Sequence, residues 1–184
     1  MVDVQQIIGR LMRIARFDHT GWAEIEKDEA ANKEAAVVVV GAALLSFIGS
    51  LIASLISGTG VGAAFIGLVL GVVLSWLAWS WITMFVGTKL FQADTNFWEM
   101  ARCIGYANAP QALGLLAFIP CVGALVGIAT LILSLVIAFF AIREALDLPT
   151  DKTILTIVIG WVIVFVISLV ISLVLGGGMA LLVR

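Results

Sequence analysis

The sequence predicts an all-α polytopic membrane protein: a bundle of five transmembrane helices preceded by an N-terminal amphipathic interfacial helix. Residues 35–88, 103–142 and 153–183 form three runs without Asp, Glu, Lys or Arg. A transmembrane helix needs about 20 apolar residues, so these runs hold two, two and one spans. The mean hydropathy of +1.19 and the charged fraction of 12% also indicate a membrane protein, because soluble domains contain about 25% charged residues.

The basic residues predict the orientation of the chain. If the turns inside the two longer runs, at residues 58–62 and 120–123, lie outside, nine of the ten Lys and Arg residues fall on the inner side. The positive-inside rule then places the N-terminus in the cytosol and the C-terminus across the membrane. We expect a cytosolic segment 1–34 and a membrane domain 35–184, with spans at about 35–57, 62–87, 103–119, 121–142 and 153–175.

Residues 3–16 are expected to form the amphipathic helix. At 100° per residue, six apolar residues face one side, while Gln6 and three arginines face the other. Such a helix can lie in the cytosolic interface, where each arginine near anionic headgroups contributes about 1 kcal/mol. Alternatively, its apolar face docks on the protein's own bundle or on a partner, and both alternatives place it at the inner surface. The arginines are Arg10, Arg13 and Arg16, and the apolar residues are Val4, Ile7, Ile8, Leu11, Ile14 and Ala15.

Residues 20–30 predict a second, short and charged helix. Thr20 is its expected N-cap, and Trp22 and Ile25 lie one turn apart as its apolar anchor. Asn32 is then expected to cap the first span, and Glu34 to mark the cytosolic boundary. A calcium site draws its ligands from a loop with a glycine turn, which this stretch lacks. We therefore interpret its acidic residues as a solvated helix face; they are Glu24, Glu26, Asp28 and Glu29.

Small residues at helical spacing predict close contacts between the spans. In lipid, helices associate through packing and interhelical hydrogen bonds, and small residues let their backbones approach closely. The sequence leaves open whether these faces join helices of one chain or of two chains. The candidates are Ser46, Ser50 and Ser54 in the first span, Gly67 and Gly71 in the second, and Gly123 and Gly127 in the fourth.

The third predicted span is short and carries polar residues. Asn96 and Glu99 have the spacing of a capping box, so a helix is expected to start near Phe97 and to bend within residues 105–110 before it crosses. Proline removes a backbone donor, and the carbonyl that it leaves free must find another partner inside the membrane. We interpret the region as a kink satisfied by side chains, and a binding pocket is the alternative. The residues of this candidate kink are Tyr106, Asn108, Pro110 and Gln111.

Several short motifs resemble the Yip-domain family of five-span membrane proteins. The resemblance covers roughly residues 20–175, and the order and spacing of its motifs agree with the five-span count. It implies a non-enzymatic protein that binds other proteins in the membrane; eukaryotic members are associated with prenylated Rab-type GTPases. The motifs are Trp22-x-x-Ile25-x-x-Asp28, Gly105-Tyr106-Ala107-Asn108-Ala109-Pro110, Phe118-Ile119-Pro120-x-x-Gly123 and Ile142-Arg143-Glu144-Ala145-Leu146-x-Leu148.

Two departures from the family pattern separate this chain from the eukaryotic members. The long hydrophilic N-terminal region of those members is replaced by an Arg-rich and an acidic helix, which argues against GTPase binding. Pro149 stands where relatives tend to carry a small polar residue. The resemblance therefore indicates a prokaryotic-type member in the plasma membrane.

The sequence offers little for catalysis. The chain has a single histidine, His19, and neither metal-ligand spacing nor a phosphate-binding glycine loop after a strand. We therefore expect no enzyme activity, cofactor, metal or nucleic acid, and predict a scaffold or accessory subunit that binds membrane lipids and other integral membrane proteins, such as those of a larger complex. The alternative is a small-solute transporter or permease component, although the predicted spans lack the ionisable residues typical of coupled carriers. The candidate lipid or partner contacts are Arg10, Arg13, Arg16, Trp22 and Trp98.

Overall fold

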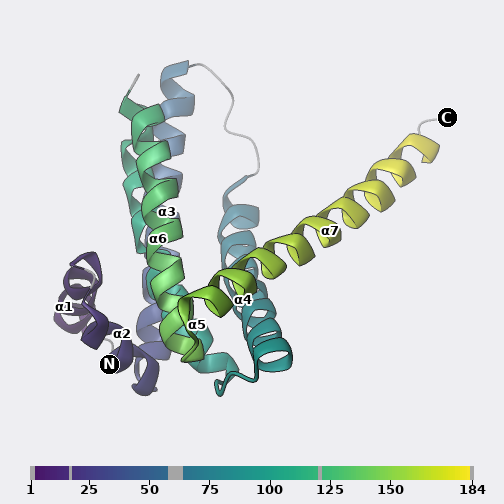
Figure 1. Cartoon of the computed structure of the whole chain (residues 1–184). Coiled ribbons are helices and arrows are strands. Elements are labelled where there is room, and N and C mark those ends of the chain that lie inside the picture. Colours follow the sequence, from purple (N-terminus) through teal and green to yellow (C-terminus); the bar gives the residue numbers. More distant parts are fainter. Residues whose placement is uncertain (1–2, 17, 58–63, 120–121, 183–184) are drawn as a thin grey trace.

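The computed structural model describes residues 3–16, 18–57, 64–119 and 122–182, and every regular element in these ranges is a helix (Figure 1). The two helices predicted near the N-terminus, 3–16 and 20–30, are both present, within one to three residues of their expected bounds. The elements are α1 (Val4–Ala15), α2 (His19–Lys27), α3 (Ala31–Ser57), α4 (Ala64–Phe91), α5 (Phe97–Ala107), η1 (Ala109–Phe118), α6 (Val122–Leu146) and α7 (Thr150–Leu182).

Four helices in the described ranges are long and apolar enough to cross a membrane, whereas the sequence predicted five spans. The four segments are Ala31–Ile56, Gly71–Phe91, Val122–Leu146 and Thr150–Val170. The third predicted span, 103–119, is instead the second half of α5 followed by the 3-10 helix η1. The predicted turn at 58–62 and the first half of the turn predicted at 120–123 lie outside the described residues, whereas residues 122 and 123 begin α6.

Local caps explain where several helices begin. Asn96 accepts hydrogen bonds from the backbone N–H groups of Trp98 and Glu99, and the Glu99 carboxylate accepts one from the Asn96 N–H, which confirms the predicted capping box. Asp18, and not Thr20, caps α2, because its carboxylate accepts the Thr20 N–H. Asn32 lies inside α3 and not before it, since this helix already begins at Ala31.

The helices are arranged as a bundle with one outlying member (Figure 1). The 3-10 helix η1 packs against α3 and α6, while α4 contacts α3, α5 and α7. Helix α5, the last turns of α4 and α6 and the first turn of α7 lie at the same end of the molecule. These segments contain Arg102, Lys89, Arg143 and Lys152, so we call it the basic end. The N-terminal helices α1 and α2 lie at this end, and α7 runs from it diagonally away from the bundle.

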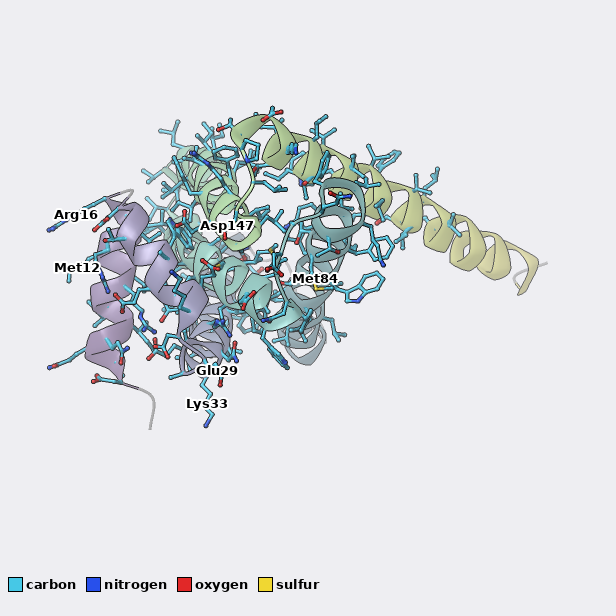
Figure 2. All side chains as sticks on the ribbon, turned by 60° about the horizontal axis from the view of Figure 1, so that its bottom comes forward. Met12, Arg16, Glu29, Lys33, Met84 and Asp147 are labelled. Carbon is cyan, nitrogen blue, oxygen red and sulfur yellow. The ribbon has the colours of Figure 1, made fainter. Side chains whose placement is uncertain are left out.

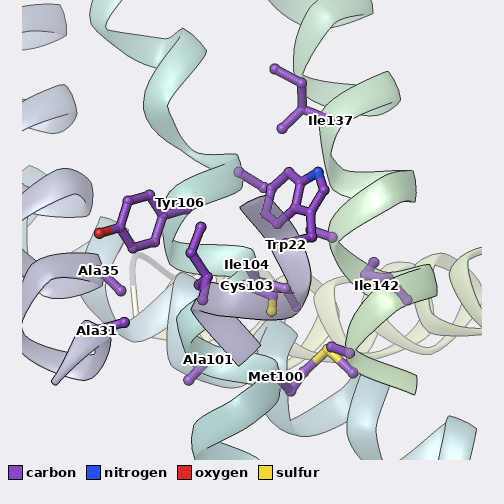
Figure 3. Packing of buried hydrophobic residues seen from close by; sticks show 14 of the residues in the cluster. Trp22, Ala31, Ala35, Met100, Ala101, Cys103, Ile104, Tyr106, Ile137 and Ile142 are labelled. Carbon is purple, nitrogen blue, oxygen red and sulfur yellow. The ribbon is translucent and has the colours of Figure 1, made fainter. Parts of the chain in front are cut away.

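The buried core is concentrated at the basic end. Trp22, Met100, Cys103, Tyr106 and Ile142 are each at most 1% exposed and come from α2, α5 and α6 (Figure 3). Toward the opposite end the helices expose large apolar side chains to their surroundings. Examples are Leu125, Ile128 and Leu131 of α6 and Phe165 of α7.

Only part of the predicted small-residue pattern forms contacts. A Cβ added to Gly114 of η1 would collide with Ser46, and one added to Gly49 would collide with the η1 backbone, so α3 and η1 pack at close range through these residues. Ser50 is exposed and bonds its hydroxyl to the Ser46 carbonyl. Gly123 packs on Ala117 of η1. By contrast, Gly71 and Gly127 have nothing within 4 Å of an added Cβ, and the surroundings of Gly67 lie outside the described side chains.

Candidate functional site

The first helix docks on the bundle by a face that contains an arginine. Ile7, Arg10 and Ile14 of α1 are buried, at a spacing that places them on one side of a helix. Val4 and Ile8, which the sequence grouped with Ile7 and Ile14, remain 63% and 50% exposed. Met12 and Arg16 point away from the bundle (Figure 2). The docked face is therefore rotated from the predicted apolar face toward Arg10.

Arg10 lies in a pocket of carboxylates, which explains this rotation. Its side chain is 1% exposed. Its Nε donates to Glu24 Oε1 at 3.2 Å, its Nη1 to Glu34 Oε2 at 2.6 Å, and its Nη2 to Asp28 Oδ2. The Tyr106 hydroxyl donates to the same Glu34 oxygen. The predicted exposure of Arg10 to lipid headgroups is thus replaced by ion pairs that join α1, α2 and α3 around Arg10.

The other arginines of α1 occupy more open positions. Arg13 pairs with Glu24 at 2.6 Å, and the two side chains are 37% and 40% exposed. Arg16 is exposed. Because Glu24 serves both Arg10 and Arg13, and Asp28 also pairs with Arg10, the acidic residues of α2 are not the purely solvated face that the sequence predicted. Of the three predicted headgroup contacts, only Arg16 has no carboxylate within ion-pair distance in the described part of the chain.

The ion pairs perturb the protonation of these side chains. The hydrogen bond from Arg13, together with that from Arg10, lowers the pKa of Glu24 below its ordinary value. The bond from Arg10 likewise lowers the pKa of Asp28. Burial alone would lower the pKa of Arg10, but its hydrogen bonds to Asp28, Tyr106 and Glu24 outweigh burial and raise that pKa. All three side chains are therefore held in their charged forms at neutral pH.

A second buried arginine fastens α2 to the bundle. Arg102 of α5 is 3% exposed. Its Nε donates to the Ile25 carbonyl at 3.2 Å, its Nη2 donates to the Glu26 carbonyl, and its Nη1 donates to Asn32 Oδ1 at 3.3 Å. The last carbonyls of a helix lack intrahelical partners and lie at the negative end of its dipole. Arg102 therefore supplies both hydrogen bonds and a favourable charge to the end of α2.

Trp22 is an internal anchor and not a surface contact. Its indole is 1% exposed and lies among Cys103 and Ile104 of α5 and Ile137 and Ile142 of α6 (Figure 3). The predicted lipid or partner contact at Trp22 is thus covered by the protein itself. Trp98, the other predicted aromatic contact, is 54% exposed at the start of α5.

The predicted kink lies at the junction of α5 and η1. The backbone N–H of Asn108 donates to the Gly105 carbonyl at 3.2 Å, in a 3-10 pattern that leaves the Ile104 carbonyl without its usual partner. The Asn108 side-chain amide donates to Ile104 at 2.8 Å, and the Gln111 amide donates to Asn108 Oδ1 at 2.8 Å. Pro110 lies at the start of η1, where a backbone N–H would have no partner within the helix. Its missing N–H therefore costs no hydrogen bond of η1. The side chain of Tyr106 turns instead toward Glu34.

Two adjoining grooves meet at this kink. One, of about 450 Å³, lies between α4 and the α5–η1 junction, and the other, of about 190 Å³, continues toward α6 and α7. They share Trp79, Ile104, Asn108 and Gln111 as lining residues. A third groove, of about 410 Å³, lies between α4 and α7.

The sequence missed several residues that build these sites. Glu34 was expected only to mark the membrane boundary, and Arg102 served only as one of the basic residues that predict orientation. Both are buried, Glu34 against Arg10 of α1 and Arg102 against the end of α2. Arg102 binds carbonyls 76 and 77 positions away, and no local pattern encodes such a contact. The one sequence signal for Glu34 and Arg102 was that each charge stands at the edge of an apolar run. In the described ranges no group of three or more His, Cys, Asp or Glu side chains is placed to hold a metal ion.

Comparison with protein families identifies a domain that covers most of the chain. Residues 18–172 match the model of the Yip1 domain, so the match runs from α2 into α7. Comparison with curated proteins and with solved structures finds no similar chain.

Proposed function

Because the chain belongs to the Yip1 domain family, a family of non-enzymatic membrane proteins, we propose that it is a scaffold or accessory subunit that binds partner integral membrane proteins inside the bilayer. The proposal includes no GTPase, because the helices α1 and α2 ahead of the membrane helices are held against the bundle by buried arginines. The main observation in support of the scaffold proposal is the exposure of α7.

Between Trp161 and Val170, α7 exposes apolar side chains on all sides, including Trp161, Val162 and Phe165 at 54%, 56% and 68%. A helix that is apolar all round needs lipid or protein around it. Its groove with α4 is lined by Trp79, Trp161, Val164, Phe165 and Ser168. Aromatic side chains are enriched at protein interfaces, and a serine hydroxyl can bond to a neighbouring transmembrane helix. We therefore assign this groove to a transmembrane helix of the partner.

The proposal also includes five crossings, with the basic end in the cytosol. Residues 103–107 continue α5 and residues 109–118 form η1. At rises of 1.5 Å for the α-helix and 2.0 Å for the 3-10 helix, the segment extends about 28 Å, close to the hydrocarbon thickness of a bilayer. The extended 3-10 geometry lets a short apolar run serve as a crossing. An odd number of crossings then puts the two chain ends on opposite sides.

Site-specific photo-crosslinking tests the partner surface. A photoreactive residue at Val164 or Ser168 should form a protein adduct in native membranes, whereas the same residue at Ile132, exposed on α6, should react mainly with lipid. The adduct at Val164 should disappear when Trp161 and Phe165 are both changed to alanine. Adducts with lipid alone at Val164 and Ser168 would contradict the proposal.

The polar kink favours the alternative of a small-solute transporter or permease component, because it places Asn108 and Gln111 on a groove within the membrane region. For a scaffold, changing both residues to alanine should lower thermal stability without changing solute flux in proteoliposomes. A reproducible flux through the parent protein that the double change abolishes would favour the transporter.

A further inference from the structure

We propose that the two grooves at the α5–η1 junction form one binding site for a neutral amphiphile, an apolar chain that carries an uncharged hydroxyl or ester group. This site adjoins the α4–α7 groove assigned to a partner helix and shares Trp79 and Trp161 with it, but the inference does not depend on that assignment.

The larger groove has a buried floor and an exposed rim. Trp76 and Ile104 on its floor are 7% and 4% exposed, and the Trp76 indole N–H is occupied by the Ala101 carbonyl at 2.9 Å. Gly71 and Ser75, one turn apart on α4, line the same groove and are exposed. Because both lie in a helix long and apolar enough to span the membrane, the rim faces the bilayer. A ligand that partitions into lipid therefore reaches the groove sideways.

Unused hydrogen-bonding groups line the site. An amide side chain offers two N–H donors and two acceptor sites. Gln111 uses one donor, toward Asn108, and its carbonyl oxygen accepts no hydrogen bond from the described residues. Ser134 Oγ, on the smaller groove, is buried without a partner in the described part of the chain. Unpaired polar groups are costly in an apolar environment, and a ligand hydroxyl or carbonyl would supply their partners.

The lining determines the class of ligand. No charged side chain is among the described residues that line either groove, so a phosphate or carboxylate placed there would lack a counter-charge. The walls are mainly indole and aliphatic, including Trp79 and Trp161. The two grooves have volumes of about 450 and 190 Å³. Taken together, they fall in the range of small-molecule sites, which is about 300 to 1,000 Å³. A monoacylglycerol or a long-chain alcohol has this chemistry.

The test uses the full-length protein in nanodiscs and a monoacylglycerol with a photoreactive diazirine in its acyl chain. We expect labelling to concentrate on the peptides that line the grooves, and unlabelled monoacylglycerol or long-chain alcohol to compete for it. A fatty acid of equal chain length, ionised at pH 8, should compete much less. Equal competition by the fatty acid would overturn the neutral class, and labelling spread evenly over all lipid-facing helices would overturn the site.

Matched variants of α4 provide the control. Ser75→Phe fills the rim and should remove most of the competed labelling, whereas Ala78→Phe adds the same ring to an exposed position that does not line the grooves and should leave it unchanged. Gly71→Phe, at a position with nothing within 4 Å of an added Cβ, is the second filling variant if Ser75→Phe does not fold. Retention of the labelling in a folded filling variant would refute the proposal.

Discussion

Arg10 shows how one buried charge positions a helix. Removing a guanidinium from water is costly, and only the three carboxylates around it make the position favourable. Glu34 is itself 4% exposed, so it depends on Arg10 as much as Arg10 depends on it. The pair therefore fixes how α1 is rotated on the bundle and which of its apolar residues stay exposed.

Replacing Arg10 should release α1. Removal of one partner from a buried ion pair costs about 3 to 5 kcal/mol because the other charge stays buried. We expect Arg10→Met to raise hydrogen–deuterium exchange of residues 4–15 strongly, while the protein remains inserted in the membrane. Arg16→Met, at an exposed position of the same helix, is the control and should exchange like the parent. Unchanged protection of α1 in Arg10→Met would mean that its apolar contacts suffice for docking.

The attachment of α1 should also depend on pH in a defined direction. Because the pKa values of Glu24 and Asp28 are lowered by the arginines, the released state binds protons more tightly than the docked state, and acid favours release. Docking should be constant from pH 8 to pH 5 and weaken below the ordinary carboxyl pKa of about 4. Fluorescence energy transfer between labels on α1 and α6 would report it. A loss of docking between pH 5 and 7 would contradict this mechanism.

Trp22 and Arg10 mark the limit of sequence-based reasoning at this scale. Periodicity placed Trp22 on the apolar side of its helix and Arg10 on the polar side of the preceding one, and those local assignments hold. Neither assignment says that both side chains are covered, because the partners of Arg10 come from α2 and α3 and those of Trp22 from α5 and α6. Burial of a residue in a short amphipathic helix is decided by what the helix docks against.

At the scale of elements, η1 is the most informative segment. Its 3-10 form follows Pro110 and the Asn108 side chain that replaces a backbone donor at Ile104. Long 3-10 helices are uncommon because their hydrogen bonds are poorly aligned, so η1 needs support from its neighbours. The close approach of α3 at Ser46 and Gly49 provides that support.

Gly114 should therefore tolerate no side chain. Gly114→Leu would push η1 away from Ser46, and overpacking of this kind costs about 1 to 3 kcal/mol. We expect a clear fall in the thermal unfolding temperature in detergent. Gly127→Leu is the matched control, since nothing lies within 4 Å of a Cβ added there, and it should unfold near the parent temperature. An equal fall in unfolding temperature for the two variants would show that the α3–η1 contact is not the cause of the destabilisation.

At the scale of the whole molecule, the crossing number determines the topology. Four crossings would return the two ends of the chain to one side, and five would separate them. Cys103 does not report this difference, because it is fully buried and a thiol reagent will not reach it from either side of a folded protein. Cys121, the other native thiol, lies outside the described residues.

Reporter fusions give the direct measurement of topology. If η1 is a crossing, a reporter that functions only in the cytosol should be active when it is fused ahead of α1. A reporter that functions only outside should be active when it is fused after residue 184. A cysteine introduced at Lys33 or Asp147, both exposed at the basic end, should resist an impermeant reagent on intact cells and react after lysis. Both reporters on one side would leave η1 as a segment that re-enters without crossing.

The sequence by itself determined the helical class, the membrane environment, the two N-terminal amphipathic helices and the capping box at Asn96. Each of these depends on composition or on residues within one or two helical turns, so local physics decides it. The tertiary structure decided the burial of Arg10, the contacts of Arg102, the 3-10 form of η1, the pairing of Gly114 with Ser46 and the exposure of α7. In a membrane protein, lipid and protein neighbours are equally apolar, and hydrophobic patterns therefore do not distinguish a side chain that packs from one that faces the bilayer.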